Sequence, residues 1–128
     1  MTPEDGFPVQ MVGGVPVVTA PEEIDTANAE RLRAALLGAA LHGHGRFVVD
    51  LTRTRFCDTA GLHALVAAHR RTLTEGGQVL LVIPGAGVLR TFEITGLDRV
   101  IPHAASLEEA LAEMPEAQAR PSADDRSQ

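Results

Sequence analysis

Two short, unbroken apolar runs most constrain the fold of this chain. Residues 46–52 read RFVVDLT and residues 78–84 read QVLLVIP. A run of this length without polar alternation is typical of a strand that is buried on both faces of a sheet. Such a sheet needs helices on its faces, because its apolar side chains would otherwise meet water. The two runs therefore predict an α/β domain with a mostly parallel sheet.

The remaining patterns add strands and helices around these two runs. Two β-rich stretches meet at Gly13-Gly14, which indicates a hairpin within residues 9–20. Apolar residues at helical spacing predict four helices, which lie before 43, over 59–75, over 85–96 and over 106–114. We expect Asp25 or Thr26 to cap the first helix, and Ile94 to lie on the apolar side of the third. Residues 98–103 predict one more short strand.

The length and the ends of the chain indicate a single domain. A chain of 128 residues can build one hydrophobic core but hardly two. Residues 1–8 read as a flexible leader, residues 9–114 as the domain, and residues 115–128, which are polar and hold two prolines, as a disordered tail. Cys57 is the single cysteine, which excludes an internal disulfide and favours a reducing cytoplasm. No apolar run approaches the roughly 18 residues of a membrane helix, so we expect no membrane association.

The charge of the chain excludes several classes of function. The net charge is −6, there is no lysine, and the arginines are scattered along the sequence. Non-specific nucleic-acid binding depends on clustered positive charge, so we expect no nucleic-acid partner. The missing lysine also excludes a P-loop lysine and Schiff-base chemistry. We expect no cofactor.

The segment FCDTAGL, residues 56–62, places an acid and a hydroxyl where a strand becomes a helix. Asp58 or Thr59 is expected to cap that helix, which contributes about 1 kcal/mol. A hydroxyl at a helix N-terminus also stands near unpaired N–H groups and the positive end of the helix dipole. A phosphate there would add about −1.5 to −2 charge at pH 7. Thr59 is therefore well placed for a charge switch that changes the surface and leaves the fold intact.

Other groups could in principle carry chemistry, but each lacks a necessary companion. An aspartyl-phosphate on Asp58 would need Mg²⁺ ligands and a cation for the phosphoryl group, and no lysine is present. Cys57, next to Phe56, is more typical of a small buried apolar residue than of a nucleophile. We therefore expect no catalytic residue and no enzyme activity.

The histidines do not have the spacing of a metal site. His42 and His44 lie in a glycine-rich turn without a third ligand nearby. His63 and His69 are six residues apart, which puts them on different faces of one helix. The Gly-x-Gly at 85–87 lacks the third glycine of a dinucleotide site, because residue 90 is Arg. We therefore expect no metal ligands and no nucleotide site.

Residues 47–66, FVVDLTRTRFCDTAGLHALV, resemble the central segment of STAS domains, in particular of bacterial anti-sigma factor antagonists. The family pattern is a strand, Asp-Leu, a linker, and Phe-x-Asp-Ser-Ser-Gly-Leu at the start of a helix. Asp50-Leu51 and residues 56–62 take these places. The segments around Asp25 and after Gly77 resemble the flanking parts of the family, so the match covers residues 9–114 in order. In this chain Thr59 takes the place of the first serine of the pattern, and Ala60 takes the place of the second. His63 stands where a small glycine is common in the family.

The resemblance implies a fold and a regulated interaction. The fold is a STAS-like single domain, with a mixed, mostly parallel sheet of four or five strands and about four helices packed mainly on one face. By position, Thr59 is the residue that a partner anti-sigma factor kinase, a histidine-kinase-like ATPase, would phosphorylate. Phosphorylation would end binding, a phosphatase would restore it, and the free form would release a sigma factor and so regulate transcription. The partner-binding residues implied are Asp25, Asp58, Thr59, Ala60, Gly61, Leu62 and His63.

Two other roles for the same fold remain open. The chain could be a scaffold in a stressosome-type assembly, or the soluble STAS subunit of a lipid transporter. If the chain is an antagonist, we expect a cytoplasmic monomer or weak dimer. If it is a stressosome-type scaffold, we expect a large particle.

Overall fold

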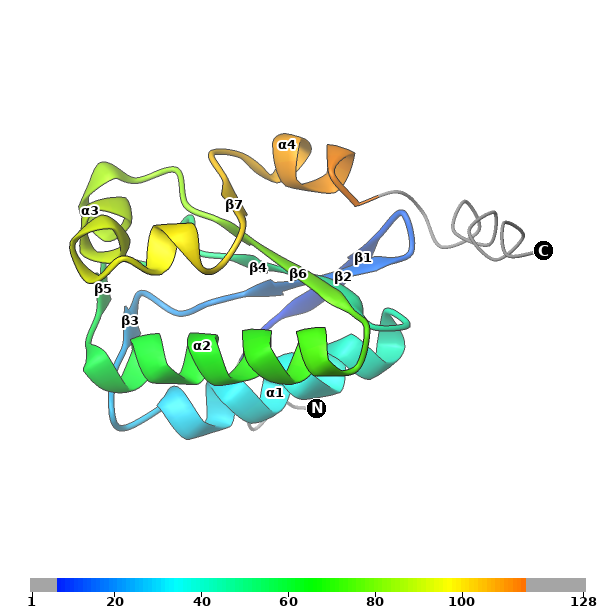
Figure 1. Cartoon of the computed structure of the whole chain (residues 1–128), viewed down its shortest axis with the longest axis horizontal. Coiled ribbons are helices and arrows are strands. Elements are labelled where there is room, and N and C mark those ends of the chain that lie inside the picture. Colours follow the sequence, from blue (N-terminus) through cyan, green and yellow to red (C-terminus); the bar gives the residue numbers. More distant parts are fainter. Residues whose placement is uncertain (1–6, 115–128) are drawn as a thin grey trace.

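The computed structural model describes residues 7–114, which form alternating strands and helices (Figure 1). Residues 1–6 of the expected leader and the whole expected tail, 115–128, lie outside the described residues. In chain order the elements are β1 (Val9–Val12), β2 (Val15–Thr19), β3 (Glu23–Ile24), α1 (Ala29–His42), β4 (Arg46–Asp50), β5 (Phe56–Cys57), α2 (Thr59–Thr74), β6 (Gln78–Val82), α3 (Ala86–Thr95), the 3-10 turn η1 (Leu97–Arg99), β7 (His103–Ala104) and α4 (Leu107–Ala112).

The main sheet has five strands in the order β1-β2-β4-β6-β7. The hairpin strand β1 runs antiparallel to β2, and the other neighbouring pairs are parallel. The two apolar runs form β4 and β6 in the middle of the sheet, where each residue from Arg46 to Asp50 pairs with one from Gln78 to Val82. The predicted mixed, mostly parallel sheet is therefore confirmed.

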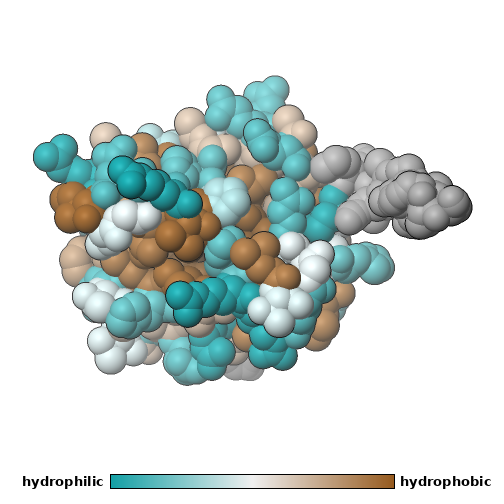
Figure 2. All heavy atoms as spheres, in the orientation of Figure 1, coloured by the Kyte–Doolittle hydropathy of each residue, from teal (hydrophilic) through white to brown (hydrophobic). Residues whose placement is uncertain are grey.

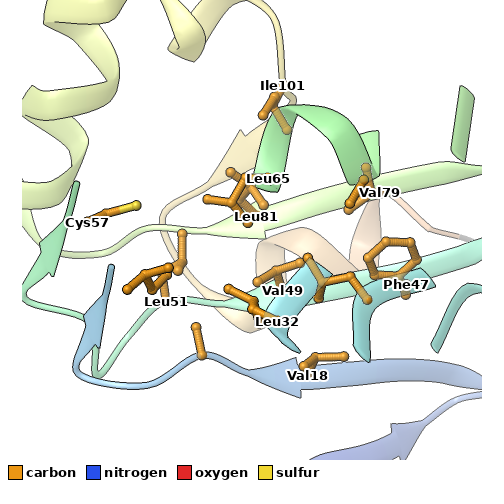
Figure 3. Close-up of a cluster of buried hydrophobic side chains, with 14 of the residues drawn as sticks. Val18, Leu32, Phe47, Val49, Leu51, Cys57, Leu65, Val79, Leu81 and Ile101 are labelled. Atoms are coloured by element: carbon orange, nitrogen blue, oxygen red, sulfur yellow. The ribbon is translucent and has the colours of Figure 1, made fainter. Parts of the chain in front are cut away.

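Helices cover both faces of this sheet, but unequally. On one face α1, α2 and α3 pack over the larger apolar cluster, part of which Figure 3 shows. Along β4 the side chains alternate, because successive residues of a strand point to opposite faces. Phe47 and Val49 join the larger cluster, whereas Val48 belongs to a smaller cluster with Ala110 and Met114. The smaller cluster is covered by α4, which lies on the other side of the sheet (Figure 1).

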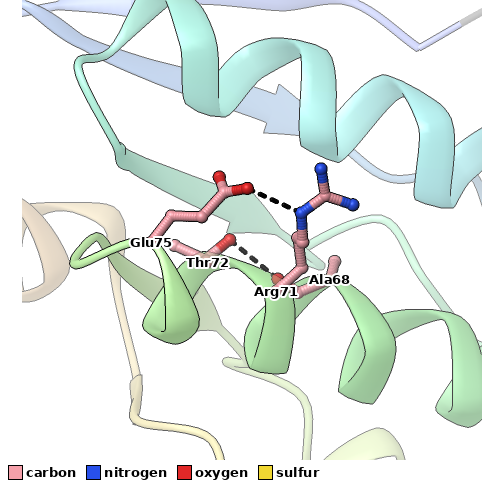
Figure 4. Close-up of polar contacts among 4 residues, drawn as sticks. All are labelled: Ala68, Arg71, Thr72 and Glu75. Atoms are coloured by element: carbon pink, nitrogen blue, oxygen red, sulfur yellow. Dashed lines mark hydrogen bonds and ion pairs between the residues drawn. The ribbon is translucent and has the colours of Figure 1, made fainter.

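The helix α2 carries the segment of interest at its start and a set of polar contacts at its end. Near its end the Arg71 Nε donates to the Glu75 carboxylate at 2.7 Å, and the Thr72 hydroxyl donates to the Ala68 carbonyl at 2.7 Å (Figure 4). These contacts close the last turn before Gly76, which has a positive φ of 80°. The helix thus ends at the glycines, as the sequence predicts.

Four details differ from the sequence-based expectations. The cap of α1 is Asn28 and not Asp25 or Thr26, and Asn28 makes no side-chain cap bond. Ile94 is 76 % exposed, so it does not lie on the buried side of α3. The expected strand at 98–103 is mostly the turn η1, and its pairing residues are His103–Ala104. Phe7 was expected to belong to the flexible leader but is buried. The Arg31 guanidinium lies over its ring, with 6.0 Å between the Arg31 Cζ and the centre of the Phe7 ring.

Some apolar side chains remain at the surface. On the face drawn in Figure 2, apolar residues are visible between α2 and the part of the domain that holds α3. Ile94 and Val100, from α3 and the segment after η1, are among the exposed large apolar residues.

Candidate functional site

The start of α2 holds the acid and the hydroxyl of FCDTAGL. Asp58 is the N-cap residue, with extended backbone, and its Oδ1 accepts a hydrogen bond from the Gly61 amide at 3.0 Å. Thr59 is the first residue of the helix and is exposed. Its hydroxyl makes no hydrogen bond to any residue within 7–114. Of the two predicted caps, Asp58 is therefore the one that forms. Thr59 is exposed, and its hydroxyl is not used by the hydrogen bonds of residues 7–114.

A small second sheet brings an earlier loop to the same place. The two-residue strands β3 and β5 pair in parallel, with Glu23 opposite Phe56 and Ile24 opposite Cys57. The Asp58 amide continues this ladder and donates to the Ile24 carbonyl at 3.0 Å. Neither strand was predicted, because two residues show no periodic pattern. Their pairing sets the loop that begins at residue 25 beside the first turn of α2.

Asp25, the acid of that loop, is held in a turn of its own. Its Oδ1 accepts from the Ala27 amide at 3.0 Å, and its own amide donates to the Asn28 Oδ1 at 3.0 Å. Asp25 is partly buried. The site therefore has two carboxylates, on Asp25 and Asp58, at the end of the paired strands where Thr59 lies.

Two of the predicted partner-binding residues lie beneath the surface. Gly61 is buried, and a Cβ added to it would stand 2.6 Å from the Ile24 Cγ2 and 2.7 Å from the Cys57 Sγ. Leu62 is only 7 % exposed and belongs to the larger core cluster. The glycine is thus required for the close packing of α2 on β3 and β5. The surface at this site consists instead of Asp25, Thr59, Ala60 and His63.

Cys57 is an inert part of this packing. Burial, and to a smaller extent the neighbouring Asp58 charge, raises the pKa of its thiol to about 12. Because the thiolate is the nucleophilic form, a thiol with this pKa does not act as a nucleophile near neutral pH.

A shallow groove runs beside Thr59 between α1 and α2. Its volume is about 400 Å³, and it is lined by Thr26, Ala29, Glu30, Arg33, Ala60, His63, Ala64 and Ala67. Its floor is made mostly of alanines, whereas Glu30 and Arg33 form an ion pair on the α1 side. His63 is exposed on the α2 side, while His69 is buried on the inner face. The two histidines thus face different ways, as their spacing predicts.

Phe56 is a surface residue of the site that the sequence analysis did not single out. It is 53 % exposed, although it directly precedes the buried Cys57. Since alternate residues of a strand point to opposite sides, an inward Cys57 requires an outward Phe56. That alternation was the available signal, but it could only be used once β5 was known to be a strand.

Between residues 7 and 114, no group of three or more His, Cys, Asp or Glu side chains is arranged to hold a metal ion. In the same range, no helix combines the length and the apolar character that crossing a membrane requires.

Comparison with known proteins gives a consistent picture. The family model of the STAS domain matches residues 7–110. BtrV of Bordetella bronchiseptica, named as a candidate anti-sigma factor antagonist, is 33 % identical over 89 residues, which cover 70 % of this chain and 77 % of the relative. A crystal structure of an anti-sigma factor antagonist from Mycobacterium paratuberculosis has a TM-score of 0.75 and 29 % identity, and the match covers 88 % of this chain and 97 % of that one.

A third match concerns the fold alone. The phosphorylated form of the Bacillus cell fate determinant SpoIIAA has a TM-score of 0.62 and 23 % identity, over 84 % of this chain and 98 % of that one. Its likeness supports the same arrangement of a sheet with helices.

Proposed function

This chain belongs to the STAS domain family, with anti-sigma factor antagonists among its relatives, and we propose that it is a partner-binding switch controlled by phosphorylation of Thr59. The proposed partner is an anti-sigma factor with a histidine-kinase-like ATPase domain. In the unphosphorylated state the chain binds that factor and so frees a sigma factor for transcription. The place of action is the cytoplasm, where the kinase finds ATP and Mg²⁺.

One observation carries the proposal: the Thr59 hydroxyl is exposed at the first turn of α2 and has no partner within the described residues. A kinase can reach such a hydroxyl without unfolding the domain. The γ-phosphoryl group passes from ATP to the Thr59 oxygen, the hydroxyl proton is lost, and ADP leaves. The chain is the substrate of this reaction and supplies no catalytic group, so it is not an enzyme.

The surroundings of Thr59 support a large effect of the phosphate on binding. The surface already carries the carboxylates of Asp25 and Asp58, and the whole chain has a net charge of −6. A phosphate adds about −1.5 to −2 charge at pH 7, and its three oxygens are strong hydrogen-bond acceptors that need donors from water or protein. A partner that fits closely around the neutral hydroxyl would have to desolvate this charge, and binding is therefore lost. A phosphatase that removes the phosphate restores it.

The proposed docking surface combines this switch with apolar contact area. It comprises Asp25, Thr59, Ala60, His63 and, on the β5 side, the half-exposed Phe56. Exposed aromatic residues often supply much of the binding energy of an interface. The groove between α1 and α2 offers a concave area that begins at Ala60, the residue after Thr59.

The experiment that tests the proposal is phosphorylation by the cognate kinase. The full chain is incubated with the anti-sigma factor and ATP, and the modified residue is located by mass spectrometry. We expect one phosphate, on Thr59, and none in Thr59→Ala. Thr74→Ala is the matched control, because Thr74 is an exposed threonine at the other end of the same helix. Absence of phosphate in the unaltered chain, or undiminished phosphate in Thr59→Ala, would overturn the proposal.

A further inference from the structure

His63 lies one helical turn after Thr59 on the exposed side of α2. Both residues are exposed, and they are four positions apart within the helix Thr59–Thr74. Side chains four apart on a helix are neighbours, with about 5–6 Å between their Cβ atoms. Helical side chains also lean toward the N-terminus, so a residue covers the turn before its own Cα. His63, which also lines the groove toward α1, is therefore the helical neighbour of Thr59 one turn further on.

The other charges near Thr59 make this histidine important. Asp58 precedes the hydroxyl, and Asp25 follows the adjoining strand β3, while Arg55 lies just before β5 on the other side of the pair. Between Thr59 and His63 the helix holds only Ala60, Gly61 and Leu62. His63 is therefore the first side chain along the helix after Thr59 that can carry a positive charge.

Charged residues of both α1 and α2 surround His63. Across the groove, α1 presents Glu30 and Arg33, and these two are already paired with each other. On α2, Asp58 caps the helix, and Arg70 stands seven residues further along, almost two turns away from the imidazole. The α1 pair is close to neutral as a unit. The imidazole is consequently free to respond to a new negative charge at Thr59.

We propose that the phosphate on Thr59 pairs with the protonated imidazole of His63, so that protonation and the phosphorylated state stabilise each other. This inference rests on the proposed function in taking Thr59 as the modified residue. The order of the pair is favourable, because an acid that precedes a base by four residues also complements the helix dipole. The effect is greatest near the second ionisation of a phosphothreonine, at about pH 6, because the phosphate there takes on its second negative charge. The device makes the phosphorylated state sensitive to pH.

The test places the phosphate without any kinase. Phosphothreonine is built into position 59 of the full chain by peptide ligation, and the phosphate is titrated by ³¹P nuclear magnetic resonance. In the unaltered background we expect the midpoint of its second deprotonation about 0.3 pH units or more below that of His63→Gln, as expected for a helical ion pair. His63→Arg, which keeps a cation at this place, should retain the low midpoint.

The matched control is His42→Gln, because His42 is an exposed histidine at the far end of α1. Its midpoint should equal that of the unaltered chain. Equal midpoints for the unaltered chain and His63→Gln, or an equal change in His42→Gln, would overturn the inference. A kinase that fails to modify Thr59 would instead overturn the proposed function and leave this titration result standing, so the two failures are distinguishable.

Discussion

Single side chains at the start of α2 have separable roles. Asp58 accepts the Gly61 amide and so satisfies one of the helix's free N–H groups, whereas Thr59 makes no bond to residues 7–114. The acid thus stabilises the helix, and the proposed function assigns regulation to the hydroxyl beside it. Under that proposal, a modification of Thr59 changes binding and leaves the Asp58 cap in place.

The cap predicts a difference between two substitutions at position 58. Asp58→Ala removes the acceptor of the Gly61 amide and should lower the free energy of unfolding by about 1 kcal/mol. Asp58→Asn keeps an acceptor oxygen and should lie within a few tenths of the unaltered chain. Urea denaturation of the three proteins measures these values. Equal losses for both variants would show that charge, and not the cap bond, is what matters there.

His69 predicts a loss of stability in acid. Its side chain is buried, its Nδ1 has no hydrogen-bond partner within the described residues, and burial lowers its pKa below the usual 6.5. The unfolded chain therefore binds a proton at a pH where the folded chain does not, so stability rises with pH in that window. We expect the free energy of unfolding to fall as the pH drops below about 6.5.

The matched measurement compares two histidine variants over pH 5 to 8. In His69→Leu the contribution of this residue to the slope should disappear, whereas His42→Leu, at an exposed position, should keep it. If the two variants give the same slope as the unaltered chain, burial of His69 does not govern the acid response.

At the scale of elements, the pair β3–β5 decides how the site is assembled. It has only two residues in each strand, yet it joins the loop of Asp25 to the start of α2. The contact depends on Gly61, whose backbone lies against Ile24 and Cys57. The position of α2 relative to this pair is therefore fixed by the absence of one side chain.

This packing predicts the effect of a single methyl group. Gly61→Ala forces Ile24 or Cys57 to move and should lower the free energy of unfolding by about 1–3 kcal/mol, despite the better helix propensity of alanine. Gly38→Ala is the control within α1, because a Cβ there meets nothing within 4 Å. It should be neutral or stabilising by up to about 1 kcal/mol. A Gly61→Ala protein as stable as the unaltered chain would contradict the close packing.

At the scale of the whole molecule, the proposed docking surface lies at one end of the domain. Three helices cover one sheet face and α4 covers the other, while Thr59, Asp25 and Phe56 lie at the end where β3 and β5 pair (Figure 1). Because Thr59 is exposed at this end, the proposed partner would not need to separate a helix from the sheet to reach it. Under the proposed function, the fold therefore stays constant while its docking surface changes charge.

The assembly state predicts which role of the fold applies. As an antagonist, the full chain should be a monomer or a weak dimer in solution, with a mass by light scattering of one or two times 13.5 kDa. A particle of many copies would contradict the antagonist role and favour a stressosome-type scaffold. Measurement at several protein concentrations distinguishes a weak dimer from a stable one.

The sequence by itself determined the local features. The apolar runs of β4 and β6, the helix between them and a cap at Asp58 or Thr59 depend on neighbours in the chain, so apolar periodicity and turn residues were enough to predict them. The place of Thr59 in the first turn of α2 belongs with these features, because it depends only on where the helix begins.

Only the tertiary structure decided which side chains are accessible. It buried Gly61 and Leu62, exposed Phe56 and Ile94, and joined the distant loop of Asp25 to α2. The physical reason is that burial depends on how elements pack against each other. Strands of two residues, such as β3 and β5, and a single glycine at a close contact, such as Gly61, show no repeating pattern in the sequence. Local patterns in a sequence can therefore predict helices and strands, whereas the packing of these elements determines which of their faces are buried.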